Sequence, residues 1–224
     1  MEVEFRFRFA LRHDTELGFR LSMRLTEPAT QTPIPPACPS RAGRPMRADA
    51  RRNRERILDA ARAVFAELGG EAQMDTIAAR AGVGVGTVYR HFPTKDALLA
   101  QMVEQRFVVF ADWAAEAEAV EEPWEAFSGY LRRCLEHCAS DLGTQYALMA
   151  VSGADLAAAA AERTGLSAAT ERLIVRAQAA DAMRRDFTID DIPVVMCGLS
   201  AAMTVPSWDW RRFLAIVLDG LRPR

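Results

Sequence analysis

From residue 47 onward the apolar residues recur with the 3.6-residue period of an α-helix, and this pattern limits the possible folds more than any other feature of the chain. The clearest stripe runs from Ile57 to Leu68 and stops before Gly69 and Gly70, a pair that favours a helix end. No later segment alternates like a strand, so the sequence predicts an all-α protein. After the first helix, further helices are expected at 75–81, 86–92, about 94–113, 123–139, 142–152, 155–164, 168–184, 191–204 and 208–221.

The first 45 residues have a different character. Six prolines between residues 28 and 45 remove backbone donors and oppose a helix. Phe5, Phe7 and Phe9 alternate with charged residues like a strand, but no partner strand can be recognised later in the chain. We therefore expect residues 1–45 to be a disordered extension, or a segment that arises from a start site assigned upstream of Met46.

Composition places the chain among ordinary globular proteins. Its 224 residues suffice for one or two domains with a sizeable core, and half of them are apolar. No run reaches the roughly 18 apolar residues of a membrane span, and the N-terminus lacks the pattern of a secretory signal. The four cysteines form no CxxC pair. These features predict a cytoplasmic protein without a membrane partner.

Positive charge is concentrated ahead of the first apolar stripe. Residues 41–56 hold seven arginines against Asp49 and Glu55, whereas residues 107–224 carry a net charge of −6. Such a run attracts a polyanion, although a solvated helix face has the same composition. Arg52 is the residue of this run that we include among the predicted DNA contacts.

The segment from Asp75 to Phe92 has the spacing of a helix-turn-helix. Ala78 is small where two helices cross, Gly82 stands where the tight turn needs a positive φ, and Val88 supplies a buried contact. A generic helical hairpin satisfies part of this spacing as well. The pattern therefore favours DNA binding without proving it.

A longer stretch, from Arg54 to Leu99, resembles the N-terminal domain of the tetracycline-repressor (TetR) family of transcriptional regulators. The resemblance rests on the run Thr87-Val88-Tyr89-Arg90-His91-Phe92 followed by Lys95, and on the order of the helices around it. It implies a three-helix helix-turn-helix DNA-binding domain at 47–93 and a larger helical bundle for ligand binding and dimerisation at 94–224. It further implies a homodimeric repressor that leaves a palindromic operator in double-stranded DNA when a small molecule binds.

The second short helix is expected to enter the major groove. The resemblance assigns contacts mostly with the DNA backbone to the side chains of Thr87, Tyr89 and His91. It assigns a phosphate contact to Lys95, the only lysine of the chain. Val85 can touch only a thymine methyl, and Gly84 caps the helix less well than serine. Tyr89 is expected to face outward and Phe92 inward. The predicted DNA contacts are Gly84, Val85, Gly86, Thr87, Tyr89, Arg90, His91, Lys95 and Arg52.

The C-terminal half offers candidates for the other two sites. The resemblance implies an inducer pocket, for which we select Phe110, Trp113, Phe127, Tyr130 and Met149. Apolar stripes on the last two helices are similar to the family's dimer interface, with Val195, Leu199, Phe213 and Val217 as its candidate residues. The same stripes could instead belong to the core of one subunit.

The sequence leaves three alternatives to a ligand-responsive repressor. Cys134, His137 and Cys138 share one helix face and could form a redox or metal sensor, with Cys197 as an obvious fourth ligand. A DNA-binding protein without a ligand would be architectural. An enzyme is disfavoured because no catalytic motif is present, and no cofactor or metal is expected.

Overall fold

The computed structural model describes residues 43–150 and 154–223, and within these ranges the chain contains helices and no strand. The predicted extension therefore lies outside the described residues up to residue 42. The helices are α1 (Gly43–Leu68), α2 (Met74–Ala81), α3 (Val85–His91), α4 (Lys95–Ala117), α5 (Pro123–Ser140), α6 (Leu142–Ala150), α7 (Ala154–Arg163), α8 (Leu166–Ala179), α9 (Asp191–Met203) and α10 (Trp210–Gly220). A 3-10 turn, Gly69–Glu71, follows α1.

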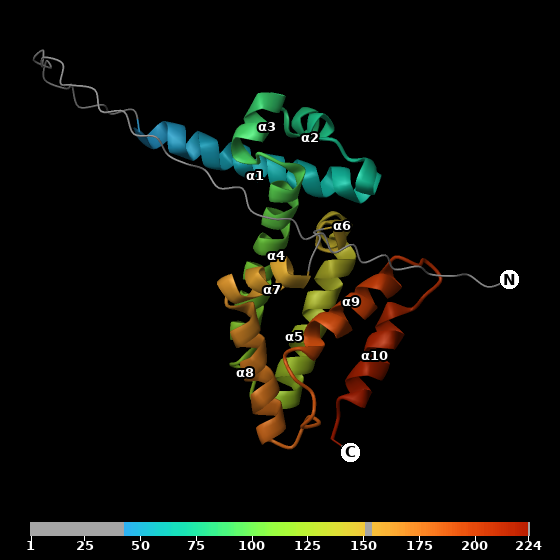
Figure 1. The fold of residues 1–224 in the computed structure, drawn as a ribbon. Coiled ribbons are helices and arrows are strands. Elements are labelled where there is room, and N and C mark those ends of the chain that lie inside the picture. The colour runs from blue at the N-terminus through green and yellow to red at the C-terminus, as the bar shows by residue number, and fades with distance from the viewer. Residues whose placement is uncertain (1–42, 151–153, 224) are drawn as a thin grey trace, which may run out of the picture. The chain divides into compact units, whose positions relative to one another are not determined.

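The described helices enclose two hydrophobic cores. The first joins α1, α2, α3 and the start of α4, with Ile57, Phe65 and Val88 fully buried. The second begins at Phe110 of α4 and continues through α5, α8, α9 and α10. Figure 1 shows α4 running from the group formed by α1, α2 and α3 toward α5, α7 and α8. The long helix α4 thus contributes side chains to both cores.

Helices α1 and α6 touch at backbone distance. A Cβ atom added to Gly143 of α6 would lie 2.0 Å from the carbonyl oxygen of Arg62 on α1. Only glycine allows this approach, because any larger residue would overlap the α1 backbone. The contact ties α1 directly to α6, which lies in sequence between α5 and α8, two helices of the second core.

Several predicted boundaries differ from the structure, among them the end of α4, which lies at Ala117 and not near residue 113. Helix α1 begins at Gly43, not at residue 47, and contains Pro45 in its first turn, where the missing backbone N–H has no intrahelical partner to lose. Helix α8 ends at Ala179, well before residue 184. Met183 and Phe187 have helical spacing and are buried, but they reach the second core from a loop.

The Gln178 side chain stabilises that loop. Its amide donates hydrogen bonds to the carbonyl oxygens of Arg184, at 3.1 Å, and of Phe187, at 2.8 Å. The backbone N–H of Arg184 donates to the carbonyl oxygen of Leu221 at 2.9 Å. These contacts replace the helical hydrogen bonds that the periodicity predicted.

Candidate nucleic-acid interface

The turn between α2 and α3 has the geometry that the sequence predicted. Gly82 adopts φ +62°, in the left-handed region. The N–H of Val83 donates to the Ala78 oxygen and the N–H of Gly82 to the Ala79 oxygen, both at 3.1 Å. This pair of bonds satisfies carbonyl groups that the helix end leaves without partners. The turn therefore fixes the direction in which α3 leaves α2.

An arginine from α1 fastens the same turn. The Arg56 Nη2 donates to the carbonyl oxygen of Ala81 at 2.5 Å and lies 3.4 Å from that of Gly82. It is also the atom that a Cβ at position 82 would meet, at 2.8 Å. Sequence reasoning counted Arg56 only within the arginine run and missed this role, because the two residues are 26 positions apart.

Helix α3 turns one face inward and one outward. Val88 is fully buried, and Phe92, just after the helix, packs beneath the Arg54 guanidinium at 4.8 Å. On the outward face Val85, Gly86 and Arg90 are exposed, as is Tyr89 with 47% of its surface accessible. The predictions for Tyr89 and Phe92 are confirmed. Thr87 and His91 lie half-buried at the sides of this face.

The two glycines at the start of α3 have open space around them. Apart from the adjoining residues and the backbone of α3 itself, no atom of the described residues lies within 4 Å of a Cβ built on Gly84 or Gly86. The N-terminal cap, Gly84, supplies no side-chain hydrogen bond. Packing within the protein therefore does not require glycine at either position, and the α3 backbone is accessible to a partner.

Lys95 and Arg52 already have contacts within the chain. The Lys95 ammonium donates to the carbonyl oxygen of Gly70 at 2.9 Å and lies 5.4 Å from the centre of the Phe65 ring. Arg52 is exposed on α1 and pairs with Asp49. Thr94 caps α4, where its hydroxyl accepts a hydrogen bond from the N–H of Ala97 at 3.0 Å, as predicted. No local sequence feature predicted the contact of Lys95 with Gly70, because the two residues are 25 positions apart.

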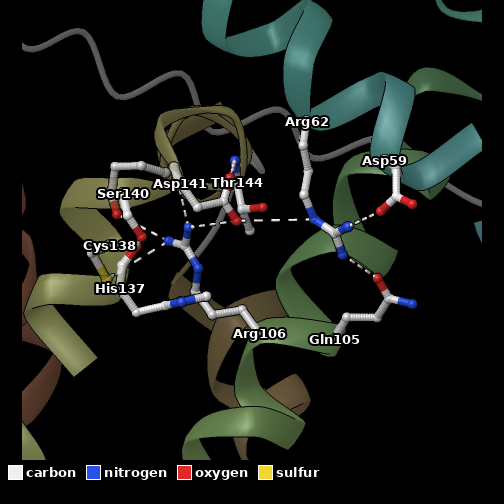
Figure 2. Close-up of polar contacts among 10 residues, drawn as sticks. Asp59, Arg62, Gln105, Arg106, His137, Cys138, Ser140, Asp141 and Thr144 are labelled. Atoms are coloured by element: carbon white, nitrogen blue, oxygen red, sulfur yellow. Dashed lines mark hydrogen bonds and ion pairs between the residues drawn. The ribbon is translucent and has the colours of Figure 1, made fainter. Parts of the chain in front are cut away.

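Most of the five residues selected for an inducer pocket lie in the second core. Phe110, Phe127 and Tyr130 are buried in the second core, and Trp113 stacks on Phe110 with ring centres 5.6 Å apart. Met149 is 57% exposed. A cavity of about 900 Å³ lies elsewhere, between α1, α4 and the turn from α5 to α6, and none of the five lines it. Figure 2 shows several polar residues of its wall, among them Asp59, Arg62, Arg106 and Asp141.

The cysteine face is buried. Cys134 and Cys138 are inaccessible, and burial raises the pKa of both thiols, so the reactive thiolate is disfavoured. His137 packs edge-on against Phe110 and Trp113, at 5.8 and 5.4 Å. Across the described residues no three His, Cys, Asp or Glu side chains form a group that could hold a metal ion. These surroundings argue against a sensor at this face.

The four candidate dimer residues divide between core and surface. Leu199 is fully buried in the second core of its own chain, so it is not available to a partner. Val195 and Val217 are half-buried, and Phe213 is exposed. Sequence reasoning missed Val194, which is 72% exposed on α9, whereas Ile216, which is 58% exposed on α10, belongs to the apolar stripe that it did predict. Both helices therefore carry exposed apolar side chains, but on faces other than the one predicted for Leu199.

An ion pair links α1 and α2. The Arg80 guanidinium forms two hydrogen bonds with the Glu67 carboxylate, at 2.8 and 2.6 Å, and this hydrogen bonding lowers the pKa of Glu67. The bridge joins α2 to α1 beside the turn. None of the helices in the described ranges is both long and apolar enough to cross a membrane.

Comparison with known proteins identifies the two parts of the chain separately. Residues 57–102 match the family of bacterial regulatory proteins of the tetR type. Residues 122–223 match the C-terminal domain of SbtR-like transcriptional regulators. The first match covers the helix-turn-helix, and the second covers helices of the second core.

Individual relatives agree with these matches. An HTH-type transcriptional regulator of Staphylococcus aureus is 41% identical over 66 residues, which are 29% of this chain and only 36% of that relative. A solved TetR regulatory protein from Mycobacterium vanbaalenii is 37% identical, with a TM-score of 0.55, over 80% of this chain and 99% of its own.

A more distant structure, the SmeT–triclosan complex, shares the fold at 23% identity, with a TM-score of 0.56 over 75% of this chain and 88% of its own. Three observations support one assignment. They are the sequence motif, the geometry of the helix-turn-helix and the match that covers 99% of the mycobacterial protein. The chain belongs to the TetR family of transcriptional regulators.

Proposed function

We propose that the protein is a homodimeric, cytoplasmic repressor that binds a palindromic operator in double-stranded DNA and leaves it when a small molecule binds. Residues 47–93 form its DNA-binding domain, and residues 94–224 its ligand-binding and dimerisation domain. The observation that carries the proposal is the outward face of α3, where Val85, Tyr89 and Arg90 are exposed beside two glycines with open surroundings. The proposal assigns no catalytic step and no cofactor.

In this proposal α3 enters the major groove with Val85 against a base edge. Thr87, Tyr89 and His91 bind backbone phosphates, as do Arg90 and Arg52. Lys95 reaches a phosphate from the first turn of α4, where the helix dipole already favours an anion. To do so, its ammonium exchanges the Gly70 carbonyl for the phosphate.

A solved structure of the same fold supports release by a ligand. The SmeT structure contains triclosan, and SmeT has the same fold. A ligand releases DNA when it binds the DNA-free conformation more tightly than the DNA-bound one. Because α1 and α6 are in contact, a conformational change in the C-terminal bundle can be transmitted to the helix-turn-helix.

Selection of bound sequences from random DNA tests the proposal. A regulator of this kind enriches a palindrome, whereas an architectural protein enriches none. Val85→Ala should then change the preferred bases at a symmetric pair of positions and leave the salt dependence unchanged. Lys95→Ala should weaken binding to all sequences. It should also reduce the slope of log affinity against log salt by about 0.9 per phosphate contact, hence by about twice that for a dimer.

Arg185→Ala is the matched control, because it removes one exposed arginine, paired with Asp181, from the segment between α8 and α9, remote in sequence from α3. A selection without a palindrome, or an unchanged salt slope for Lys95→Ala, would contradict this arrangement on DNA.

A further inference from the structure

The cavity of about 900 Å³ lies where the helix-turn-helix part meets the following helices. Ala63 of α1, Met102 and Val109 of α4, and Leu142 of α6 provide much of its apolar wall. The polar part of the wall comes from Arg62, Arg106, Asp141 and Thr144, which Figure 2 shows together. A volume of this size is typical of small-molecule sites, which are mostly apolar with a few placed polar groups.

Arg106 organises the inner end of the cavity. Only 3% of this residue is accessible. Its Nη1 donates to the Gln145 side-chain oxygen at 3.1 Å, and its Nη2 donates to the Asp141 carbonyl oxygen at 2.8 Å. The same Nη2 forms an ion pair with the Asp141 carboxylate at 3.2 Å. The guanidinium is therefore held in one orientation.

Two donors in this wall remain unused. The Arg106 Nε and the Thr144 hydroxyl are buried, and neither makes a hydrogen bond of normal geometry among the described residues, although the Thr144 side chain lies close enough to Asp141 to help lower the pKa of that carboxyl group. Both side chains meet at Asp141, whose carboxylate also accepts a hydrogen bond from the Thr144 backbone N–H at 3.0 Å. Burying a donor without an acceptor costs free energy, so such groups in native proteins call for an explanation. An acceptor oxygen supplied by a ligand would satisfy both.

The charges around the cavity balance. Asp59 pairs with Arg62 at 2.6 Å, and Asp141 with Arg106. Glu104 lies 3.6 Å from Arg163. Each carboxylate thus has its own arginine, so the wall presents no surplus charge to attract an ion. The matching ligand is uncharged.

We propose that this cavity binds an uncharged organic molecule whose ketone, amide or ester oxygen accepts hydrogen bonds from Arg106 Nε and Thr144 Oγ1. The apolar body of the ligand lies against Ala63, Met102 and Val109. This site lies against α1, outside the second core that contains most of the pocket residues predicted from sequence. As the inducer site of a repressor, it rests on the proposed function, but the binding step does not.

Binding at this place is coupled to α1. The two donors are shielded from solvent, so the ligand oxygen reaches them when the Asp141 turn shifts. Arg62 Nε of α1 lies 4.0 Å from the Asp141 carboxylate, and Arg62 Nη2 donates to the Gln105 side chain of α4 at 2.6 Å. Movement of the turn therefore changes contacts of the helix on which the helix-turn-helix packs. The ligand favours one position of α1, and DNA favours the other.

The test uses the full chain and acetophenone as an uncharged probe, with benzoate and benzylammonium as charged probes of similar shape. Methyl NMR of the DNA-free protein reports binding through the Met102 and Val109 signals. We expect acetophenone to shift these signals with an affinity at least about tenfold higher than either ion, because the ions lose hydration without gaining an opposite charge.

Thr144→Val tests the hydrogen bond. The substitution removes an unpartnered hydroxyl and keeps the backbone bond to Asp141, so the fold should be retained. It should weaken acetophenone binding by about three- to tenfold, the effect of one hydrogen bond. Ser128→Ala is the matched control, because its buried hydroxyl also lacks a partner but lies outside the cavity wall. The control should leave the affinity unchanged.

Three results overturn the proposed site: no acetophenone shift up to its solubility, equal or tighter binding of a charged probe, or an unchanged affinity in Thr144→Val. Measurement of DNA binding with and without acetophenone separates this inference from the proposed function. If acetophenone binds and DNA affinity stays constant, the coupling to α1 is wrong. If acetophenone binds but selection yields no DNA sequence, the cavity stands and the proposed function fails.

Discussion

Gly86 shows how a single residue can serve a partner more than the fold. Its surroundings are open within the described structure, so glycine lowers the helical stability of α3 without any gain in internal packing. If α3 lies in the major groove, the missing side chain allows the backbone to approach DNA. Helix stability therefore favours a side chain at position 86, whereas close approach to DNA favours glycine. The two effects can be measured separately.

We therefore expect Gly86→Ala to raise the free energy of unfolding by about 0.5 kcal/mol and to lower DNA affinity at least about threefold. Chemical denaturation and DNA titration measure the two effects. Gly129→Ala is the matched control, because Gly129 is exposed on α5 and equally open. The control should gain stability and leave DNA binding unchanged. An unaltered DNA affinity in Gly86→Ala would remove this part of α3 from the interface.

His137 links stability to pH. Burial, together with the charges of Arg106 and Arg62, lowers the pKa of His137 below its ordinary value of 6.5, although Asp141 acts in the opposite direction. The unfolded chain therefore binds a proton at this residue at higher pH than the folded chain does. The contribution of neutral His137 to stability is complete above about pH 6.5 and falls as the pH drops toward the lowered pKa.

Denaturation series between about pH 5 and pH 7 check this sign. The free energy of unfolding of the native protein should rise across this range, and His137→Phe should flatten part of the rise while retaining the contacts with Phe110 and Trp113. If the slope of His137→Phe equals that of the native protein, another group carries the pH dependence.

At the scale of elements, local patterns predicted the helix-turn-helix well. Helix ends were marked by residues with a strong local effect, such as Gly82 with its positive φ and Thr94 with its capping hydroxyl. The buried face of helix α9 was harder to predict, since this helix is apolar on several faces. Its sequence could not show that Leu199 faces the core while Val194 faces solvent, because the choice depends on where α5 and α10 lie.

Contacts between distant elements were beyond the sequence. Arg56 at the turn, Lys95 at Gly70 and the network at Asp141 each join residues at least 25 positions apart. Nothing in the local composition distinguishes these charged residues from solvated ones. For the same reason the cavity could not be located, since α1, α4 and α6 form it together only after folding.

The contact of α1 with α6 is the element-scale feature with the sharpest steric consequence. We expect Gly143→Ala to destabilise the protein by about 2–3 kcal/mol, because its methyl group would lie 2.0 Å from the Arg62 oxygen and must push the helices apart. Chemical denaturation measures the change, with Gly129→Ala as a sterically open control. If Gly143→Ala lowers the free energy of unfolding by less than an ordinary surface substitution does, α6 moves aside readily.

At the scale of the whole molecule, the proposed binding to a palindromic operator needs two recognition helices at a fixed separation, which the proposed dimer would supply. Operator half-sites are about 34–36 Å apart, one helical turn of DNA. The exposed apolar residues Val194, Phe213 and Ile216 of α9 and α10 are the proposed contact between subunits. Isolated exposed apolar residues are common, but two neighbouring helices that both carry them favour an interface.

Ile216→Arg tests this interface and corrects the choice of Leu199. The exposed arginine should leave the subunit folded and yield a monomer in analytical ultracentrifugation, because two such charges would face each other across a twofold axis. A monomer holds one half-site, so the slope of log affinity against log salt should fall to about half. Val175→Arg, at an exposed apolar position of α8, is the control and should remain dimeric. Leu199→Arg should unfold the subunit, because it places a charge in the second core. A folded Ile216→Arg dimer with the native salt slope would show that the subunits meet elsewhere.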